Sequence, residues 1–203
     1  MEFNKLAIIS DDLTGAMDSS GYLAAKGINS SVIFNLDSIP DTDSVAVSTD
    51  SRTGSASDAR MKVTHASRKI GLRNIYKKID STLRGHIGIE LKSLMDSMNI
   101  HRALVAPAFP DTGKTTIAGT MLIDGVPIHK SSFAKDPTNP VSQAHIPTLL
   151  SQSMQYSVGT LSLDVTSKGS NAIQNQMRAN THNILVCDAR EQKHLQSIAE
   201  AAA

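Results

Sequence analysis

Tryptophan is absent from this chain of 203 residues, and aromatic residues make up only 3% of it. A surface that stacks nucleic-acid bases needs aromatic side chains, so such a surface is not expected. An excess of charge of one sign is also missing, because 20 Lys and Arg residues are balanced by 19 Asp and Glu residues. That balance gives no electrostatic basis for binding nucleic acid or an anionic membrane. The composition favours a small polar ligand, held by hydrogen bonds and local charge.

Cysteine and long apolar runs are equally scarce. Cys187 is the only cysteine, which excludes an internal disulfide, and its apolar neighbours predict a buried core thiol rather than a reactive nucleophile. The first apolar run, residues 6–9, is too short for a signal peptide or a membrane span. A soluble, cytoplasmic protein is therefore expected by default. The histidines show no metal-ligand spacing, so no metal site is predicted.

The pattern of apolar residues predicts an α/β fold. Short β-rich runs alternate with helix-compatible stretches, which is typical of a mostly parallel sheet with helices on both faces, in a Rossmann-like arrangement. Residues 115–133 break this rhythm, and glycines between their apolar residues predict an inserted β-hairpin. The expected strands are residues 5–10, 31–34, 44–48, 74–79, 103–106, 160–165 and 184–186, and the expected helices are residues 15–26, 57–70, 87–98, 141–152, 168–179 and 191–203.

The densest group of chemically useful side chains follows the strand predicted at residues 74–79. Lys78, Asp80, Ser81 and Arg84 lie within a few positions of one another, and a helix is expected to begin near Gly85. In an α/β sheet such strand-to-helix turns lie at the carboxyl edge, where small ligands bind. The simpler alternative is a capped helix with a solvated ion pair. Similar polar clusters after other strands favour the ligand site.

Two adjacent carboxylates, Asp11 and Asp12, follow the first predicted strand and precede a helix. Paired carboxylates can accept hydrogen bonds from sugar hydroxyls, accept a proton or hold Mg²⁺. Thr14 can cap the helix, and Gly15 permits a close approach of the backbone. The alternative is that one aspartate only caps the helix. Two adjacent acids exceed what a cap requires, so a functional role is favoured beside a capping role.

Two further loops contribute candidates. Arg52 follows the third predicted strand and can form a bidentate contact with a carboxylate, although a solvated, exposed arginine is equally consistent. The loop Ala-Pro-Ala-Phe-Pro at residues 106–110 is rigid and could form the wall of a pocket through Phe109. Residues 111–116 are similar to the end of a P-loop. Ala108 stands where that motif needs glycine, however, and a hairpin is predicted where it needs a helix. We therefore do not interpret this segment as a nucleotide-binding loop.

Several of these motifs together resemble the four-carbon acid sugar kinases, the family that phosphorylates threonate, erythronate or 3-oxo-tetronate. The resemblance covers nearly the whole chain, and the motifs occur in the family's order. It covers only the family's amino-terminal, sugar-binding half. Lys114 stands where arginine is usual, and His86 stands where asparagine is common. The motifs that carry the resemblance are residues 11–16, 78–85, 106–110, 113–116, 124–127 and 136–140.

The resemblance implies that residues 1–203 are the sugar-acid-binding domain of a kinase, whose carboxy-terminal nucleotide-binding domain is absent because the chain is truncated or split. ATP and Mg²⁺ would be supplied by that missing domain, and the fragment alone would be inactive. The expected partners are a small sugar acid, the carboxy-terminal kinase domain and, as an option, a second copy in a homodimer. The alternatives are a self-contained P-loop-like nucleotide-binding protein and a non-catalytic interaction domain.

Each candidate side chain has a role in this interpretation. Lys78 and Arg84 suit the carboxylate of a tetronate, whereas Asp12 and Asp80 suit its hydroxyls and are the candidates for a catalytic base. The residues expected to bind substrate are Asp11, Asp12, Gly15, Arg52, Lys78, Asp80, Ser81, Arg84, Gly85, Phe109 and Thr116.

Overall fold

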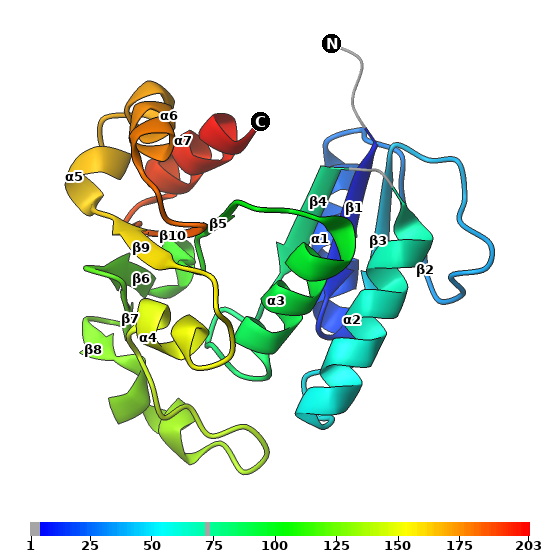
Figure 1. Ribbon diagram of the computed structural model, residues 1–203, viewed down its shortest axis with the longest axis horizontal. Coiled ribbons are helices and arrows are strands. Elements are labelled where there is room, and N and C mark those ends of the chain that lie inside the picture. The colour runs from blue at the N-terminus through cyan, green and yellow to red at the C-terminus, as the bar shows by residue number, and fades with distance from the viewer. Residues whose placement is uncertain (1–4, 72–73) are drawn as a thin grey trace. The chain divides into compact units, whose positions relative to one another are not determined.

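The computed structural model describes residues 5–71 and 74–203. These residues divide into two compact units, the first formed by the described residues up to 80 together with residues 85–99, and the second by residues 81–84 and 100–203. Each unit contains a parallel sheet with helices, which confirms the predicted α/β class (Figure 1). The parallel strands form two sheets where the sequence pattern predicted a single one. The physical reason is that each group of strands is packed in its own hydrophobic cluster.

The first unit is built on a parallel sheet with the strand order β2-β3-β1-β4. Ser10 at the end of β1 pairs with Ser48 of β3 on one side and with Lys78 of β4 on the other. The carboxyl ends of these three strands are therefore level, and the loops that follow them leave the sheet at one edge. The elements are β1 (Leu6–Ser10), α1 (Leu13–Ala25), β2 (Ser30–Ile33), β3 (Ser44–Ser48), α2 (Ala56–Ile70), β4 (Asn74–Lys78) and α3 (Ile87–Met98).

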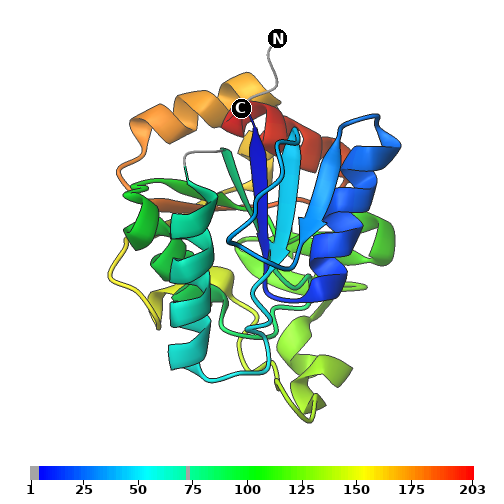
Figure 2. The ribbon, with the colours of Figure 1, turned by 90° about the vertical axis from the view of Figure 1, so that its right-hand side faces the viewer.

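Helices cover both faces of this sheet, as the pattern predicted. Ala7 and Ile9 belong to a buried cluster with Val63 of α2 and Leu94 of α3. Ile8 points the other way, because side chains alternate along a strand, and it packs with residues of α1. Figure 2 shows α1 and α2 on opposite sides of the strands. The connections after β1 and β3 therefore diverge, which is where open α/β sheets bind ligands.

Local chemistry sets the ends of these helices. Asp12 is the N-cap of α1, and its Oδ1 accepts a hydrogen bond from the Gly15 amide at 2.8 Å. A capping role for one of the paired aspartates is thus confirmed, whereas Thr14 lies inside the helix. Ser55 caps α2 in a capping box, and the helix ends at Gly71, whose φ of 72° favours glycine. That end agrees with the prediction.

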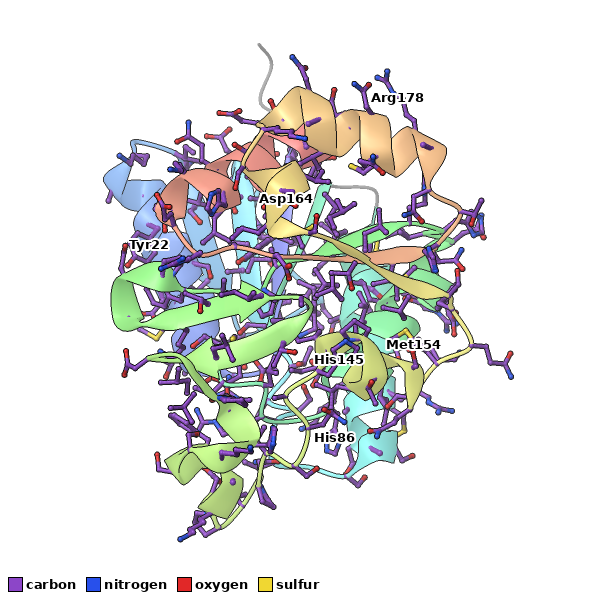
Figure 3. All side chains as sticks on the ribbon, turned by 90° about the vertical axis from the view of Figure 1, so that its left-hand side faces the viewer. Tyr22, His86, His145, Met154, Asp164 and Arg178 are labelled. Carbon is purple, nitrogen blue, oxygen red and sulfur yellow. The ribbon has the colours of Figure 1, made fainter. Side chains whose placement is uncertain are left out.

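The second unit contains a parallel sheet with the order β5-β10-β9 and an antiparallel sheet with the order β6-β7-β8. In Figure 3, Asp164 is labelled on the short helix α5 of this unit. The elements are β5 (Ala103–Val105), η1 (Pro110–Thr112), β6 (Lys114–Ile117), β7 (Thr120–Ile123), β8 (Val126–Pro127), η2 (Ile128–Lys130), η3 (Ser132–Lys135), α4 (Ile146–Ser151), β9 (Val158–Leu161), α5 (Leu163–Thr166), α6 (Ser170–Ala179), β10 (Ile184–Cys187) and α7 (Gln192–Ala202).

The antiparallel sheet confirms the predicted hairpin. Ala118 and Gly119 join β6 to β7 with φ values of 49° and 69°, and Asp124 and Gly125 join β7 to β8 with 48° and 82°. Positive φ at both central residues is what a tight type I′ turn requires. The buried carboxylate of Asp188 accepts hydrogen bonds from the Ala118 amide at 2.7 Å and the Gly119 amide at 2.8 Å. The first turn is thereby fixed to the end of β10.

Two predicted elements differ from the structure. The helix expected at residues 141–152 is reduced to α4, in which Pro147 occupies the first turn, where its missing N–H costs no hydrogen bond. The strand expected at residues 160–165 ends at Leu161, and α5 follows. The Ser162 carbonyl accepts the amides of Val165 and Thr166, which turns the chain into that helix. Across residues 5–71 and 74–203, no helix is long and apolar enough to cross a bilayer.

Cys187 is fully buried on β10, as predicted from its apolar neighbours. Burial first, and the charge of Asp188 second, raise the pKa of its thiol to about 12. We therefore expect Ellman's reagent to modify the native protein at pH 8 only as fast as β10 opens, because the thiolate is the reactive form. Denaturant should release one reactive thiol per chain at once. Immediate modification of the native protein would contradict this burial.

Candidate functional site

The polar side chains at the carboxyl edge of the first unit meet around Arg52. Its Nε donates to Asp11 Oδ2 at 2.6 Å, and its Nη2 donates to Asp11 Oδ1 at 3.0 Å. Its Nη1 donates to Asp12 Oδ2 at 2.7 Å. The guanidinium thus holds both carboxylates at once, with the bidentate geometry that its planar shape allows. The predicted contact of Arg52 with a carboxylate is made within the chain, and a contact with substrate stays a prediction.

Charge and burial reinforce this cluster. Asp11 is buried, and the side chains of Arg52 and Asp12 are 17% and 27% exposed. Burial is the largest single influence and disfavours the charged guanidinium, but the hydrogen bonding and charge of Asp11, together with the two other carboxylates nearby, raise the pKa of Arg52. The charges of Asp80 and Asp12 act in the same direction. Asp80, in the loop after β4, therefore belongs to the same electrostatic cluster.

Two glycines bring the backbone against these groups. A Cβ atom on Gly15 would lie 2.6 Å from Ser10 Oγ and 2.8 Å from Asp12 Oδ1. Gly85 has a φ of 86°, and a Cβ there would lie 3.2 Å from Arg52 Cγ. The structure gives Gly15 the close approach that the sequence predicted. A side chain at Gly15 would force Ser10 and Asp12 to move, and one at Gly85 would strain the backbone and press against Arg52.

Lys78 adds a cation at the same edge. Its Nζ donates to the Ile79 carbonyl at 2.9 Å, and its Cγ would lie 3.2 Å from a Cβ on Gly15. An ammonium carries three donors, so the observed contact leaves capacity for a ligand carboxylate. Carboxylate oxygens likewise accept more than one hydrogen bond each. The edge therefore offers a cation and several acceptors, the chemistry that suits a hydroxy acid.

Arg84 belongs to the second unit. Its Nη1 donates to Asp136 Oδ2 at 3.3 Å, and its guanidinium lies 5.7 Å from the centre of the Phe133 ring. The other oxygen of Asp136 accepts the amides of Thr138 and Asn139, which fixes the carboxylate in a turn. Arg84 is thus held in one direction by a charge and an aromatic ring. Its predicted contact with a ligand carboxylate stays a prediction.

The remaining candidates also lie in the second unit. Ser81 is partly buried, Phe109 is 39% exposed, and Thr116 is fully buried in β6. The Thr116 backbone pairs with Ala189, and its Oγ1 has no hydrogen-bond partner among the described residues. The structure brings together the first-unit candidates, which are Asp11, Asp12, Gly15, Arg52, Lys78, Asp80 and Gly85. The roles of Ser81, Phe109 and Thr116 stay predictions.

The pKa of Asp136 is lowered, chiefly by hydrogen bonds from the amides of Asn139 and Thr138 and less by Arg84. Its stabilising contribution is therefore complete above the pKa of the unfolded carboxyl and is lost as the pH falls through the lower, folded value. We expect the ¹³C signal of the Asp136 carboxyl to titrate at a lower pH than an ordinary aspartate carboxyl does. In Arg84→Met it should move only part of the way back, because the amides remain. A midpoint at or above the ordinary value in the unsubstituted chain would contradict this geometry.

The segment that is similar to a P-loop is part of the hairpin sheet. Lys114 begins β6, its Nζ donates to Thr112 Oγ1 at 2.9 Å, and it lies 5.7 Å from the centre of the Phe109 ring. A Cβ on Gly113 would lie 2.1 Å from Asp124 Oδ1. No helix follows Gly113 here, so the helix N-terminus that cradles phosphates in a P-loop is missing. An ATP phosphate site does not fit this segment, which supports the interpretation from sequence.

Sequence reasoning missed a buried ion pair that is linked through Ser51 to the loop carrying Arg52. Lys77 Nζ lies 2.7 Å from Glu90 Oε2, and these side chains are 7% and 1% exposed. Ser51 Oγ donates to Glu90 Oε1 at 2.7 Å. A signal was present, because Glu90 lies on the buried face of α3 beside Leu91 and Leu94, where an unpaired carboxylate is costly.

Comparison with known proteins places these observations in a family. The model of the sugar-binding N-terminal domain matches residues 6–203. A D-erythronate kinase of Heliobacterium modesticaldum is 33% identical, and a D-threonate kinase of Salmonella typhimurium is 34% identical, each over 98% of this chain and 48% of the relative. The chain thus spans about half the length of these relatives.

A solved structure agrees with the fold. A domain of unknown function from Bordetella bronchiseptica, described as a domain-swapped dimer with bound citrate, superposes with a TM-score of 0.85 at 28% identity. The match covers 97% of this chain and 50% of that chain. The resemblance inferred from the motifs is thereby confirmed. This chain belongs to the sugar-binding N-terminal domain family, whose members include the amino-terminal halves of four-carbon acid sugar kinases.

Proposed function

We propose that this chain is the substrate-binding half of an ATP-dependent kinase that phosphorylates the terminal hydroxyl of a four-carbon acid sugar. The observation that carries the proposal is the cluster in which Arg52 holds Asp11 and Asp12 beside Lys78 and Asp80. Family membership supports it, because the matched relatives are named as D-erythronate and D-threonate kinases. Citrate, the molecule bound in the Bordetella structure, is also a hydroxy acid.

The roles follow from the chemistry of the ligand. A tetronate has one carboxylate and several hydroxyls, so it needs one cation and several acceptors. Lys78 supplies the charge for the carboxylate, and Asp12 and Asp80 accept hydrogen bonds from the hydroxyls. One of these aspartates accepts the proton of the attacking hydroxyl. Phosphoryl transfer depends mostly on positioning and charge neutralisation, so this base contributes modestly and the fixed geometry contributes more.

The phosphoryl donor would come from outside this chain. ATP with Mg²⁺ would be bound by a carboxy-terminal domain of the longer protein, and closure of that domain would bring the phosphoryl group to the hydroxyl and exclude water. This chain then binds and orients the sugar acid, and it turns nothing over alone. A homodimer is part of the proposal, supported by the domain-swapped dimer of the Bordetella protein.

Calorimetry on this chain tests the proposal. D-Threonate, D-erythronate and 3-oxo-tetronate should be titrated beside erythritol, which lacks the carboxylate, and butyrate, which lacks the hydroxyls. We expect binding of at least one sugar acid and of neither control. Asp12→Asn should weaken that binding roughly tenfold or more, because hydrogen bonds to a charged acceptor are strong. The matched variant Asp50→Asn, at an exposed position in the loop after β3, should bind normally. Binding of none of the acids by a folded sample would reject the proposal.

A further inference from the structure

Buried polar groups fix the loop that carries Arg52 to the end of β1. Thr49 Oγ1 donates to the Ser10 carbonyl at 2.9 Å and lies 2.7 Å from Ser51 Oγ. The Ser51 amide donates to the Asp11 carbonyl at 3.0 Å. Between them, Asp50 has a φ of 44°, which is uncommon for a residue other than glycine. A backbone in this conformation persists only where its surroundings fix it.

Glu90, a residue of α3, connects this helix to the loop that carries Arg52. It is 1% exposed, and both of its oxygens have partners on other elements. Oε1 accepts from Ser51 Oγ at 2.7 Å, and Oε2 lies 2.7 Å from Lys77 Nζ. Lys77 also donates to the Lys78 carbonyl at 3.0 Å. One carboxylate therefore connects α3 with β4 and with the residue next to Arg52.

We propose that Glu90 is a positioning residue for the Asp11–Asp12–Arg52 cluster: it fixes Ser51 and thereby the direction from which Arg52 meets the two aspartates. The geometry supports this role because hydrogen bonds hold both the backbone and the side chain of Ser51. Its backbone is bonded to Asp11, and its hydroxyl is bonded to Glu90. Loss of the hydroxyl bond removes the link between this loop and α3. The loop then stays attached through Thr49, through backbone amides, through Lys62, which donates to the Asp50 carbonyl at 2.6 Å, and through the contacts of Arg52 itself.

The role in ligand binding rests on the proposed function, whereas the control of Arg52 does not. The variant that tests the link is Ser51→Ala, which removes the bond to Glu90 together with the contact to Thr49 Oγ1 and leaves the Lys77–Glu90 ion pair intact. The matched control is Ser67→Ala. Ser67 is also buried in the first unit, and its hydroxyl donates to the Thr64 carbonyl at 3.0 Å and lies 2.6 Å from Ser97 Oγ.

The first measurement is exchange of the Arg52 Nε–H with solvent, followed by ¹⁵N NMR and assigned by its loss in Arg52→Lys. This proton is hydrogen-bonded to Asp11 at 2.6 Å, so its exchange reports the cluster directly. We expect exchange to become roughly fivefold faster or more in Ser51→Ala, the factor for loss of one buried hydrogen bond. Ser67→Ala should leave it unchanged. Equal rates in the two variants would overturn the proposal, even if both are destabilised.

The second measurement is calorimetry with the sugar acid that binds the unsubstituted chain. Ser51→Ala should weaken binding severalfold, and Ser67→Ala should not. Glu90→Gln provides an independent test, because its amide oxygen can still accept from Ser51 and should preserve slow Nε–H exchange better than Glu90→Ala does. Equal acceleration in Glu90→Gln and Glu90→Ala would also overturn the proposal. If the unsubstituted chain binds no acid, the proposed function fails, while the exchange rates still decide the role of Glu90.

Discussion

Lys77→Met should lower the free energy of unfolding by about 3–5 kcal/mol, the largest effect that we expect from a single substitution. Lys77 and Glu90 form a buried ion pair with side chains 7% and 1% exposed. Methionine fills a similar volume but leaves the Glu90 carboxylate without its cation. In the unsubstituted chain, the attraction between the two charges offsets the free energy of removing them from water. Without Lys77, the desolvation of the Glu90 carboxylate is no longer offset by a neighbouring cation.

Urea unfolding followed by circular dichroism measures this effect, and two variants sharpen it. Lys77→Met combined with Glu90→Gln should recover most of the lost stability, because the uncompensated charge is gone. Lys69→Met is the control, since the Lys69–Asp37 pair has side chains 43% and 76% exposed and surface pairs contribute little. Equal effects of Lys77→Met and Lys69→Met would show that burial of the first pair makes no difference to its contribution.

Gly15→Ala and Gly21→Ala should act in opposite directions, although both lie in α1. A Cβ on Gly21 meets no atom of the described residues within 4 Å, so alanine should stabilise the helix by about 1 kcal/mol. A Cβ on Gly15 would lie 2.6 Å from Ser10 Oγ, closer than real Cβ contacts. The new methyl group forces Ser10 and Asp12 to move, and such overpacking costs about 1–3 kcal/mol.

Ligand binding separates the two variants further. Gly15→Ala displaces Asp12, so we expect it to weaken sugar-acid binding strongly, whereas Gly21→Ala should bind as the unsubstituted chain does. Urea unfolding and calorimetry on the same samples test both parts. If Gly15→Ala leaves both the stability and the affinity unchanged, then the close approach of the Gly15 backbone to Ser10 and Asp12 is not required for the site.

Features that depend on neighbouring residues could be predicted from the sequence. The end of α2 at Gly71 and the turn at Asp124 and Gly125 follow from the conformations that glycine allows. The burial of Cys187 follows from its apolar run. The carboxyl-edge cluster was also predictable, because parallel strands end at one edge. Asp11, Asp12 and Lys78 therefore meet as expected in the first unit.

Features that depend on distant partners were not predictable. Arg52 and Asp11 are 41 positions apart, and Ser51 and Glu90 are 39 positions apart. A local pattern does not reveal whether an arginine contacts a ligand or a carboxylate of its own chain. The division of the parallel strands between two sheets is non-local in the same sense, because it depends on which hydrophobic residues pack together.

Amide chemical shifts on titration with D-threonate, followed by ¹H–¹⁵N NMR on this chain, test the central claim most directly. The account predicts that the largest shifts in the first unit occur at residues 10–15, 49–52 and 78–80, the loops at the carboxyl edge of its sheet. Shifts that instead gather around Arg178, which lies on α6 (Figure 3), or no shifts at all at saturating ligand, would contradict it.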